Sequence, residues 1–140
     1  MPREKDVADR TLLIIKPDAV ERNLIGRIIE RLERARFKIA AMKMIQLSYD
    51  EARKFYAVHE GRPFLDELCK FMSSGPVVPM IVESEGDAVS GVRALIGATD
   101  PSEAAPGTVR HDLAVSLTKN SVHASDGKET AETEIEFFFS

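Results

Sequence analysis

The sequence predicts an α+β domain, in which helices cover a four-stranded antiparallel sheet in the order βαββαβ. Three observations carry this prediction. The run Thr11–Ile15 is short and continuously apolar, as in a buried central strand. Several later segments carry apolar residues at helical spacing with charged residues between them. Shorter apolar runs or alternations, typical of strands, separate these helical segments.

The first half of the chain divides at proline and capping residues. Pro17 ends the first strand, and residues 25–32 follow with the apolar spacing of a helix. Residues 37–47 show a looser alternation that predicts a second strand. Ser48 with Glu51 three residues later matches a capping box, which predicts that a helix begins there.

The second half begins with another helical segment, which Pro63 opens. The run Val77–Val82 predicts a third strand, and Pro79 within it indicates an edge position or a bulge. Asp87 caps a further helix. Residues 97–108, with two prolines and two glycines, predict a long loop of the kind that often carries function.

The last strand and the last helix complete the predicted order. Leu113, Val115 and Leu117 alternate as a fourth strand would. Ser125 and Asp126 precede a final helix. His123 is therefore predicted to lie at the junction between the fourth strand and that helix.

Length and composition limit the class of protein. With 140 residues we expect one domain over 1–140, with residues 1–9 as a loose leader. A hydrophobic content of 44% with 30% charged residues argues against disorder. No apolar run spans a bilayer and no secretion signal opens the chain, so we expect a cytoplasmic protein without a membrane partner. The single Cys69 fits a reducing compartment, and the net charge of -4 disfavours nucleic acid as a partner.

Two groups of residues are candidates for chemistry. At its junction, His123 has the chemistry of a base, a nucleophile or a metal ligand, although spacing alone favours a solvent-facing loop residue. Lys16, Arg93 and Arg110 stand at element ends and loops, which is compatible with convergence on one polyanion or with ordinary solvated surface. Neither a GxxxxGK[ST] loop nor a GxGxxG turn is present, so side chains would have to hold any phosphate.

These residues also carry a family resemblance. The segment Asn120–Asp126 (Asn-Ser-Val-His-Ala-Ser-Asp) resembles the N-x-x-H-[G/A]-S-D signature of nucleoside diphosphate kinases. The likeness covers the chain from Arg10 to Phe139 and includes further blocks in the same order. These blocks are Thr11–Ala19, Phe55–Tyr56, Arg62–Phe64, Ser74–Val78, Gly97–Pro101 and Pro106–Arg110.

The resemblance implies a ferredoxin-like sandwich, in agreement with the predicted order of elements. It implies transfer of the γ-phosphoryl group from a nucleoside triphosphate to a nucleoside diphosphate, which balances nucleotide pools. The route is ping-pong through a phosphohistidine, and by position His123 is the nucleophile. Mg²⁺ would arrive on the nucleotide phosphates rather than at a protein metal site. The family is also homo-oligomeric, with tetramers or hexamers built from dimers.

Further roles follow from matching positions in the family pattern. Glu134 matches the carboxylate that orients the histidine ring, and Ser125 matches the hydroxyl beside it. Tyr56 matches a residue near the transferred group. The remaining matches are Arg93, Thr99 and Arg110 for the phosphates, Lys16 and Asn120 for the sugar hydroxyls, and Phe64 with Leu117 for the two sides of the base. In the family pattern the residue at the position of Lys16 also lies near the phosphates.

The sequence departs from the family pattern at three positions, and two other functions are alternatives. Ala124 stands where many members have glycine, Arg36 occupies a turn position often filled by glycine, and Pro79 interrupts a strand. One alternative is a nucleotide-sensing or scaffold protein that kept the fold without turnover, and another is a nucleic-acid binder. Tight ADP binding without exchange would favour the first, and steeply salt-dependent duplex binding would favour the second.

Overall fold

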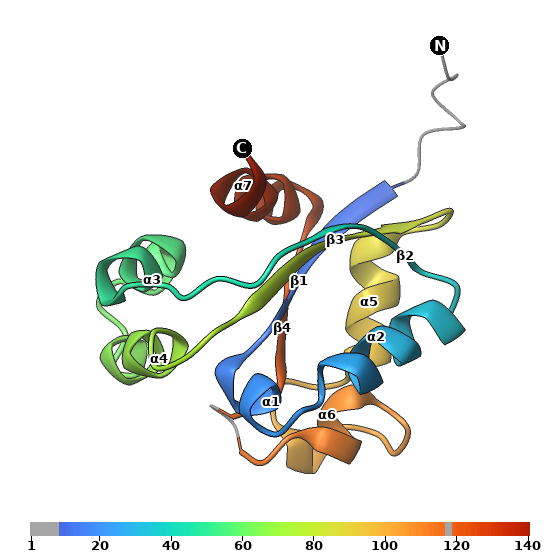
Figure 1. Ribbon diagram of the computed structural model, residues 1–140, viewed down its shortest axis with the longest axis horizontal. Coiled ribbons are helices and arrows are strands. Elements are labelled where there is room, and N and C mark those ends of the chain that lie inside the picture. Colours follow the sequence, from blue (N-terminus) through green and yellow to red (C-terminus); the bar gives the residue numbers. More distant parts are fainter. Residues whose placement is uncertain (1–8, 117–118) are drawn as a thin grey trace.

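The computed structural model describes residues 9–116 and 119–140, which fold into one sheet with helices on both faces (Figure 1). The strands are β1 (Asp9–Ile15), β2 (Lys38–Met42), β3 (Val78–Ser84) and β4 (Val122–Ala124). The helices are α1 (Pro17–Glu21), α2 (Ile25–Arg34), α3 (Tyr49–Phe55), α4 (Leu65–Met72), α5 (Ala88–Ile96), α6 (Val109–Leu113) and α7 (Lys128–Phe139), with 3-10 turns at Ala57–His59 and Pro101–Glu103. The sheet order is β2-β3-β1-β4 and every neighbouring pair is antiparallel. The predicted α+β class is confirmed.

Strand β1 lies at the centre because both of its faces are apolar. Leu13 and Ile15 pack into a core shared with α2 and α5, whereas Leu12 and Ile14 pack into a second core under α3, α4 and α7. These two sets of helices lie on opposite sides of the sheet (Figure 1). The continuous apolar run is therefore a strand buried on both faces, as the sequence predicts.

Helix starts agree closely with the capping residues. The Ser48 hydroxyl accepts a hydrogen bond from the Glu51 amide at 3.0 Å, and the Glu51 carboxylate accepts from the Ser48 amide at 2.9 Å. Asp87 accepts from the Ser90 amide at 3.1 Å at the start of α5. Both predicted caps are confirmed, because a side-chain oxygen next to the free amides of a first turn is a local arrangement.

The predicted fourth strand is wrong. Leu113 ends helix α6, where it and Val109 are buried one helical turn apart. Leu117 lies outside the described residues, and the fourth strand is instead Val122–Ala124. Spacing misled here because alternate apolar residues also fit part of a helical period. His123 therefore lies within a strand rather than after one.

Pro79 does not lie in an edge strand, because β3 pairs with β1 on one side and β2 on the other. Its carbonyl accepts from the Lys43 amide at 3.2 Å, just after β2 ends. The backbone of Pro79 therefore faces β2, at a point just past the end of that strand. The missing proline N–H removes no hydrogen bond from the regular pairing of β2 with β3. The ladder irregularity that the proline suggested lies in β2, between Ile39 and Ala41.

The N-terminal boundary also differs slightly from the prediction. Residues 1–8 of the expected leader lie outside the described residues, while Asp9 is the first residue of β1. Among the described residues, no helix is both long enough and apolar enough to cross a bilayer.

Arg36 lies just beyond helix α2, after the C-cap Ala35, and adopts the left-handed region with φ of 69°. The Arg36 amide donates to Glu33 and the Phe37 amide donates to Leu32, which is the hydrogen-bond pattern of a Schellman cap. That position favours glycine, because a Cβ there costs about 1–2 kcal/mol.

We expect Arg36→Gly to raise the free energy of unfolding by about 0.5 kcal/mol, since the relief of strain exceeds the added entropy of the unfolded chain. Urea denaturation measures it. Arg36→Ala is the matched control, because it removes the charge but keeps the Cβ and should give no comparable gain. Equal gains for both variants would contradict the strain argument.

Candidate active site

One cleft of 520 Å³ collects most of the residues that the sequence resemblance singles out. Those on its wall are Lys16, Tyr56, Phe64, Arg93, Thr99, Arg110, Asn120, His123 and Glu134. Ser125 is buried behind this wall and contacts Glu134. Leu117 lies outside the described residues. Segments from both halves of the chain thus contribute to one hollow.

His123 is placed by strand alternation. Val122 and Ala124 face the core beneath α2 and α5, so the half-buried His123 between them faces the opposite side, towards α3 and α7. Nε2 of His123 lies 3.1 Å and 3.2 Å from the two carboxylate oxygens of Glu134. The Ser125 hydroxyl donates to the same carboxylate at 2.5 Å. Glu134 therefore orients the ring and leaves Nδ1 available for chemistry.

Aromatic rings at the C-terminal end of α3 contact the histidine. Phe55 and Tyr56 meet His123 edge-on, with ring centroids 5.3 Å and 5.8 Å away. The Tyr56 hydroxyl is buried and has no hydrogen-bond partner among the described residues. Burial raises the pKa of Tyr56, and the Glu134 carboxylate adds to that effect. The phenol therefore stays neutral, with its O–H free to donate to a ligand in the cleft.

Two buried cations lie on the wall of the cleft. Arg110 is 5% exposed and donates to the carbonyl oxygens of Gly97 at 3.1 Å and Val122 at 2.9 Å. Burial, with a smaller contribution from Arg93, lowers the pKa of Arg110 to about 10. Burial and the nearby Arg110 lower the pKa of Lys16 to about 8. Positive charge held out of water in this way attracts a polyanion more strongly than charge on a solvated surface.

Arg93 approaches the same site from α5. It is more exposed than Arg110 and donates to the Ala124 carbonyl at 3.3 Å. The carbonyl that it contacts belongs to the residue next to His123. Arg93 and Arg110 therefore reach the strand that carries the histidine from two different helices.

Asn120 links the loop after α5 to the lysine. Its side-chain oxygen accepts from Lys16 Nζ at 2.9 Å, and its side-chain amide donates to the Thr99 carbonyl at 3.1 Å. Ser121, the next residue, has φ of 74° and is fully buried. Non-glycine residues in this region are strained and concentrate at functional sites.

The mouth of the cleft carries an exposed aromatic platform. Phe64 is 42% exposed, Arg62 lies 5.6 Å from its ring centroid, and His59 meets it edge-on at 5.2 Å. An exposed aromatic ring of this kind can stack on any nucleobase. His59 lines the cleft as well, although its spacing in the sequence marks it only as a surface residue. The sequence could have indicated that His59 lies at the cleft, because His59 stands between Tyr56 and Phe64, which both match site residues of the family.

Two other lining residues had no signal in the sequence. Val58 and Thr130 border the cleft, and their residue types and spacing indicate nothing specific. Asp126 borders it as well and is the last residue of the signature segment Asn120–Asp126. His111 lies apart on α6, with Nδ1 3.0 Å from the Ala104 carbonyl. The described residues contain no group of three or more His, Cys, Asp or Glu side chains that could hold a metal ion.

Comparison with known proteins decides the family. The family model for nucleoside diphosphate kinase matches residues 9–140. The chain belongs to the nucleoside diphosphate kinase family. It is 60% identical over 131 residues to the nucleoside diphosphate kinase of Desulfatibacillum aliphaticivorans, covering 94% of each chain. It is 57% identical to that of Nitratiruptor sp., covering 94% of this chain and 95% of the relative.

Solved structures of the nucleoside diphosphate kinase family agree with the fold. The Aquifex aeolicus enzyme superposes with a TM-score of 0.92 at 45% identity, covering 96% of each chain. The Halobacterium salinarum enzyme, solved in complex with CDP, gives 0.91 at 43% identity and covers 96% of this chain and 89% of that one. The ferredoxin-like sandwich is therefore confirmed, and the chain is an enzyme of this phosphotransferase family.

Proposed function

We propose that this chain transfers the γ-phosphoryl group of a nucleoside triphosphate, typically ATP, to a nucleoside diphosphate through a phosphohistidine at His123, and thereby balances nucleotide pools. The observation that carries the proposal is the ring of His123, which Glu134 holds at 3.1 Å on the wall of a cleft that also gathers lysine and arginine. A neutral imidazole with one nitrogen held and the other free is a nucleophile.

The reaction has two half-steps that balance. Nδ1 of His123 attacks the γ-phosphorus, the N–P bond forms, and the bond from phosphorus to the bridging oxygen breaks, so the diphosphate leaves with the electron pair. A terminal oxygen of the second diphosphate then attacks the same phosphorus, and the N–P bond breaks. Throughout, the N–H at Nε2 donates to Glu134, which stabilises positive charge on the ring.

The cations supply most of the remaining catalysis. A phosphoryl group in transfer spreads negative charge over its oxygens, and fixed positive charge lowers the energy of that state. We assign Arg93, Thr99 and Arg110 to the phosphates. Tyr56, whose buried hydroxyl has no partner among the described residues, is assigned to the region of the transferred group.

The nucleoside would lie towards the mouth of the cleft. Lys16 and Asn120, which are joined by a 2.9 Å hydrogen bond, are assigned to the sugar hydroxyls. Phe64 is assigned to one side of the base, and its exposure supports stacking. Leu117, proposed for the other side, lies outside the described residues. Stacking recognises every base, so we expect broad nucleotide specificity.

Mg²⁺ is proposed to enter as part of the nucleotide. The cleft gathers lysine and arginine, and the described chain offers no group of three or more metal-ligating side chains. These donors do not fit a resident magnesium ion, whereas phosphate oxygens suit it well. On the nucleotide, the ion neutralises part of the phosphate charge.

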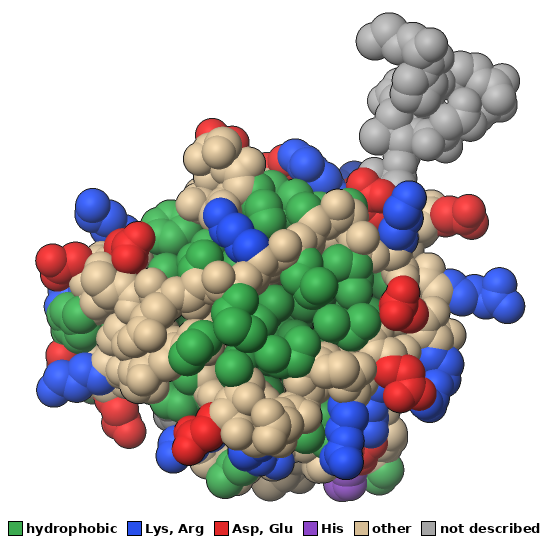
Figure 2. All heavy atoms as spheres, viewed as in Figure 1, with side chains coloured by type: hydrophobic (Ala, Val, Ile, Leu, Met, Phe, Trp, Pro, Cys, Tyr) green, Lys and Arg blue, Asp and Glu red, His purple; other side chains and the backbone are tan. Residues whose placement is uncertain are grey.

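Assembly as a homo-oligomer, a tetramer or hexamer built from dimers, is also part of the proposal. Strand β2 is at an edge of the sheet. Its last residue, Met42, is 51% exposed, and Met44 just after it is 56% exposed. Figure 2 shows a broad apolar area on one face of the molecule, and such areas favour protein contacts. We further propose a cytoplasmic location, with no membrane or nucleic acid as partner.

The deciding experiment is incubation with γ-labelled ATP alone, followed by exchange. We expect a protein label that is labile in acid and stable in alkali, and that unlabelled GDP removes as labelled GTP. Initial rates should give the parallel double-reciprocal lines of a ping-pong route. ADP binding without label or exchange would instead support the nucleotide-sensing alternative and overturn the proposal.

Lys16 gives a pH prediction. Its pKa of about 8 means that the ammonium is present below pH 8 and is lost above it. Because kcat/KM reports the free enzyme, it should fall about tenfold by pH 9 relative to its plateau. The pKa of Arg110 is higher, about 10, so we attribute the fall in kcat/KM between pH 8 and pH 9 to Lys16.

Adenine nucleotides suit the pH measurement, because adenine does not titrate in that window. Lys16→Arg is the matched control, since a guanidinium keeps its charge and should extend the plateau. An unchanged alkaline limb in Lys16→Arg would remove Lys16 as its cause.

A further inference from the structure

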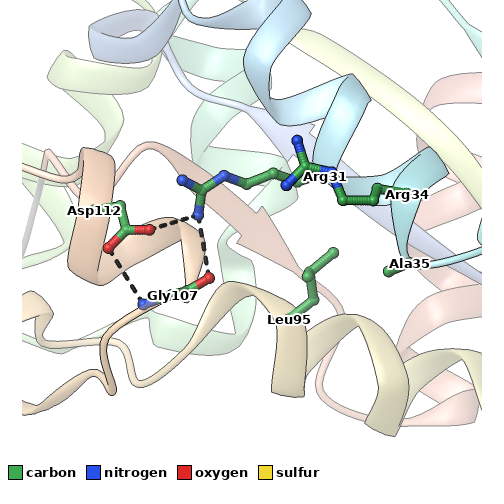
Figure 3. A pocket seen from close by; sticks show the side chains of 6 residues that line it. All are labelled: Arg31, Arg34, Ala35, Leu95, Gly107 and Asp112. Atoms are coloured by element: carbon green, nitrogen blue, oxygen red, sulfur yellow. Dashed lines mark hydrogen bonds and ion pairs between the residues drawn. The ribbon is translucent and has the colours of Figure 1, made fainter.

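An ion pair outside the cleft joins helix α2 to helix α6 at a surface pocket (Figure 3). Nη1 of Arg31 lies 2.8 Å from Asp112 Oδ2 and donates to the Gly107 carbonyl at 3.2 Å. The Gly107 amide donates to Asp112 Oδ1 at 3.3 Å. Each member of this triad thus contacts the other two. We call Arg31, Gly107 and Asp112 the α6 clamp.

We propose that the α6 clamp positions Arg110 for phosphate binding, so that Arg31 and Asp112 serve the reaction from outside the cleft. This inference rests on the proposed function. None of the clamp residues lines the cleft, and the family comparison of sequence blocks assigns no role to Arg31 or Asp112. They are positioning residues, because they act through α6.

Helix α6 needs external support because it has only five residues. Isolated helices shorter than about 12 residues are marginal in water, so tertiary contacts must hold this one. Val109 and Leu113 anchor one side in the core. Arg22 donates to the Leu113 carbonyl at 2.6 Å at the C-terminal end, and the clamp holds Asp112 one residue earlier.

The clamp also sets the rotation of α6 about its axis. Residues two apart on a helix point in nearly opposite directions. Asp112 points to Arg31 on α2. Arg110, on the opposite side of α6, therefore points into the cleft, where it donates to the carbonyls of Gly97 and Val122. Loss of the Asp112 contact frees this rotation, and the guanidinium of Arg110 moves with it.

The loop before α6 is held by the same contacts. Gly107 has φ of 89° and receives Arg31 on its carbonyl and Asp112 on its amide. This loop begins beyond α5 and carries Thr99, whose carbonyl accepts from Asn120. The clamp therefore fixes the far end of a segment whose near end contributes to the phosphate site.

The test uses Arg31→Gln, Asp112→Asn and the double variant in the full-length protein. Each single variant should raise KM for ATP and the Kd for ADP about tenfold, with kcat within about threefold of the parent. The reason is that a displaced Arg110 contacts the bound phosphates less well but keeps its charge in the cleft during transfer, unlike Arg110→Met, which removes that charge. The double variant should be no weaker than the single variants, because both remove one pair. Arg31→Lys keeps the charge and should restore part of the affinity.

Arg34→Gln is the matched control. Arg34 lies in the same pocket and on the same helix (Figure 3). It pairs, however, with Glu30 of its own helix. Its KM and Kd should equal those of the parent. Light scattering and thermal melts on every variant separate a change in affinity from a change in assembly or folding.

Two results would overturn the inference: parental KM and Kd in folded Arg31→Gln and Asp112→Asn, or an equal loss in Arg34→Gln. If the two single variants do not fold, Arg31→Lys decides, with a raised KM supporting the clamp and a parental KM contradicting it. Exchange by the parent protein tests the proposed function separately, so failure of one is distinguishable from failure of the other.

Discussion

His123→Ala is expected to abolish labelling by γ-labelled ATP and to lower kcat/KM for exchange by at least about 10⁴-fold, because it removes the atom that forms the covalent intermediate. The residues that orient the His123 ring would keep their positions in the variant. Glu134 and Ser125 would still share their 2.5 Å hydrogen bond, and the cations would still lie around the cleft. Nucleotide binding should therefore survive while turnover is lost.

Acid-labile label and coupled exchange rates measure this prediction, and calorimetry with ADP measures the retained binding. His111→Gln is the matched control, because His111 lies outside the cleft, beside the Ala104 carbonyl, and should keep its label. Persistent acid-labile label in His123→Ala would place the nucleophile elsewhere. Loss of ADP binding together with turnover would indicate that the variant damaged the cleft rather than the chemistry.

Arg110→Met is expected to lower kcat/KM about 10²–10³-fold without a matching loss of stability. The guanidinium stabilises charge that develops in transfer, and removal of one such preorganised group has effects of about this size. Its partners within the described chain are the neutral carbonyls of Gly97 and Val122. Burial of a cation opposite neutral acceptors is costly, as its lowered pKa of about 10 also indicates.

An apolar side chain of similar length relieves that cost, so the free energy of unfolding should fall by no more than about 1 kcal/mol. Urea denaturation and steady-state kinetics on one preparation test both halves. Arg10→Met is the matched control, since Arg10 forms a surface ion pair with Glu132 at 2.8 Å, outside the cleft, and activity should be unchanged. A large loss of stability with modest loss of activity in Arg110→Met would mark Arg110 as a structural residue.

Much of the fold was accessible from local patterns. The apolar run of β1 and the cap at Ser48 depend on residues close together in the chain, and both predictions are confirmed. The fourth strand was mispredicted because β4 has three residues, too few to show an alternation. It exists because β1 offers it an edge, with Ile14 opposite His123, and that pairing joins segments more than a hundred residues apart.

The site divides in the same way. The signature around His123 and the blocks that accompany it pointed to a phosphohistidine enzyme, and they did so as a resemblance rather than from spacing. Spacing alone left Lys16, Arg93 and Arg110 as separate cations. Their shared cleft follows from sheet pairing and from the placement of α5 and α6, which no local pattern records.

The amino-acid sequence alone determines the fold class of this protein, its family likeness and the nature of its chemical groups, since these depend on residue identity and near-neighbour spacing. Folding settled how those groups act on one another. It turned Glu134 towards Nε2 of His123, removed Arg110 and Lys16 from water, and set Asp112 against Arg31. Burial and distance govern pKa and charge stabilisation, and both quantities arise only when remote segments pack together.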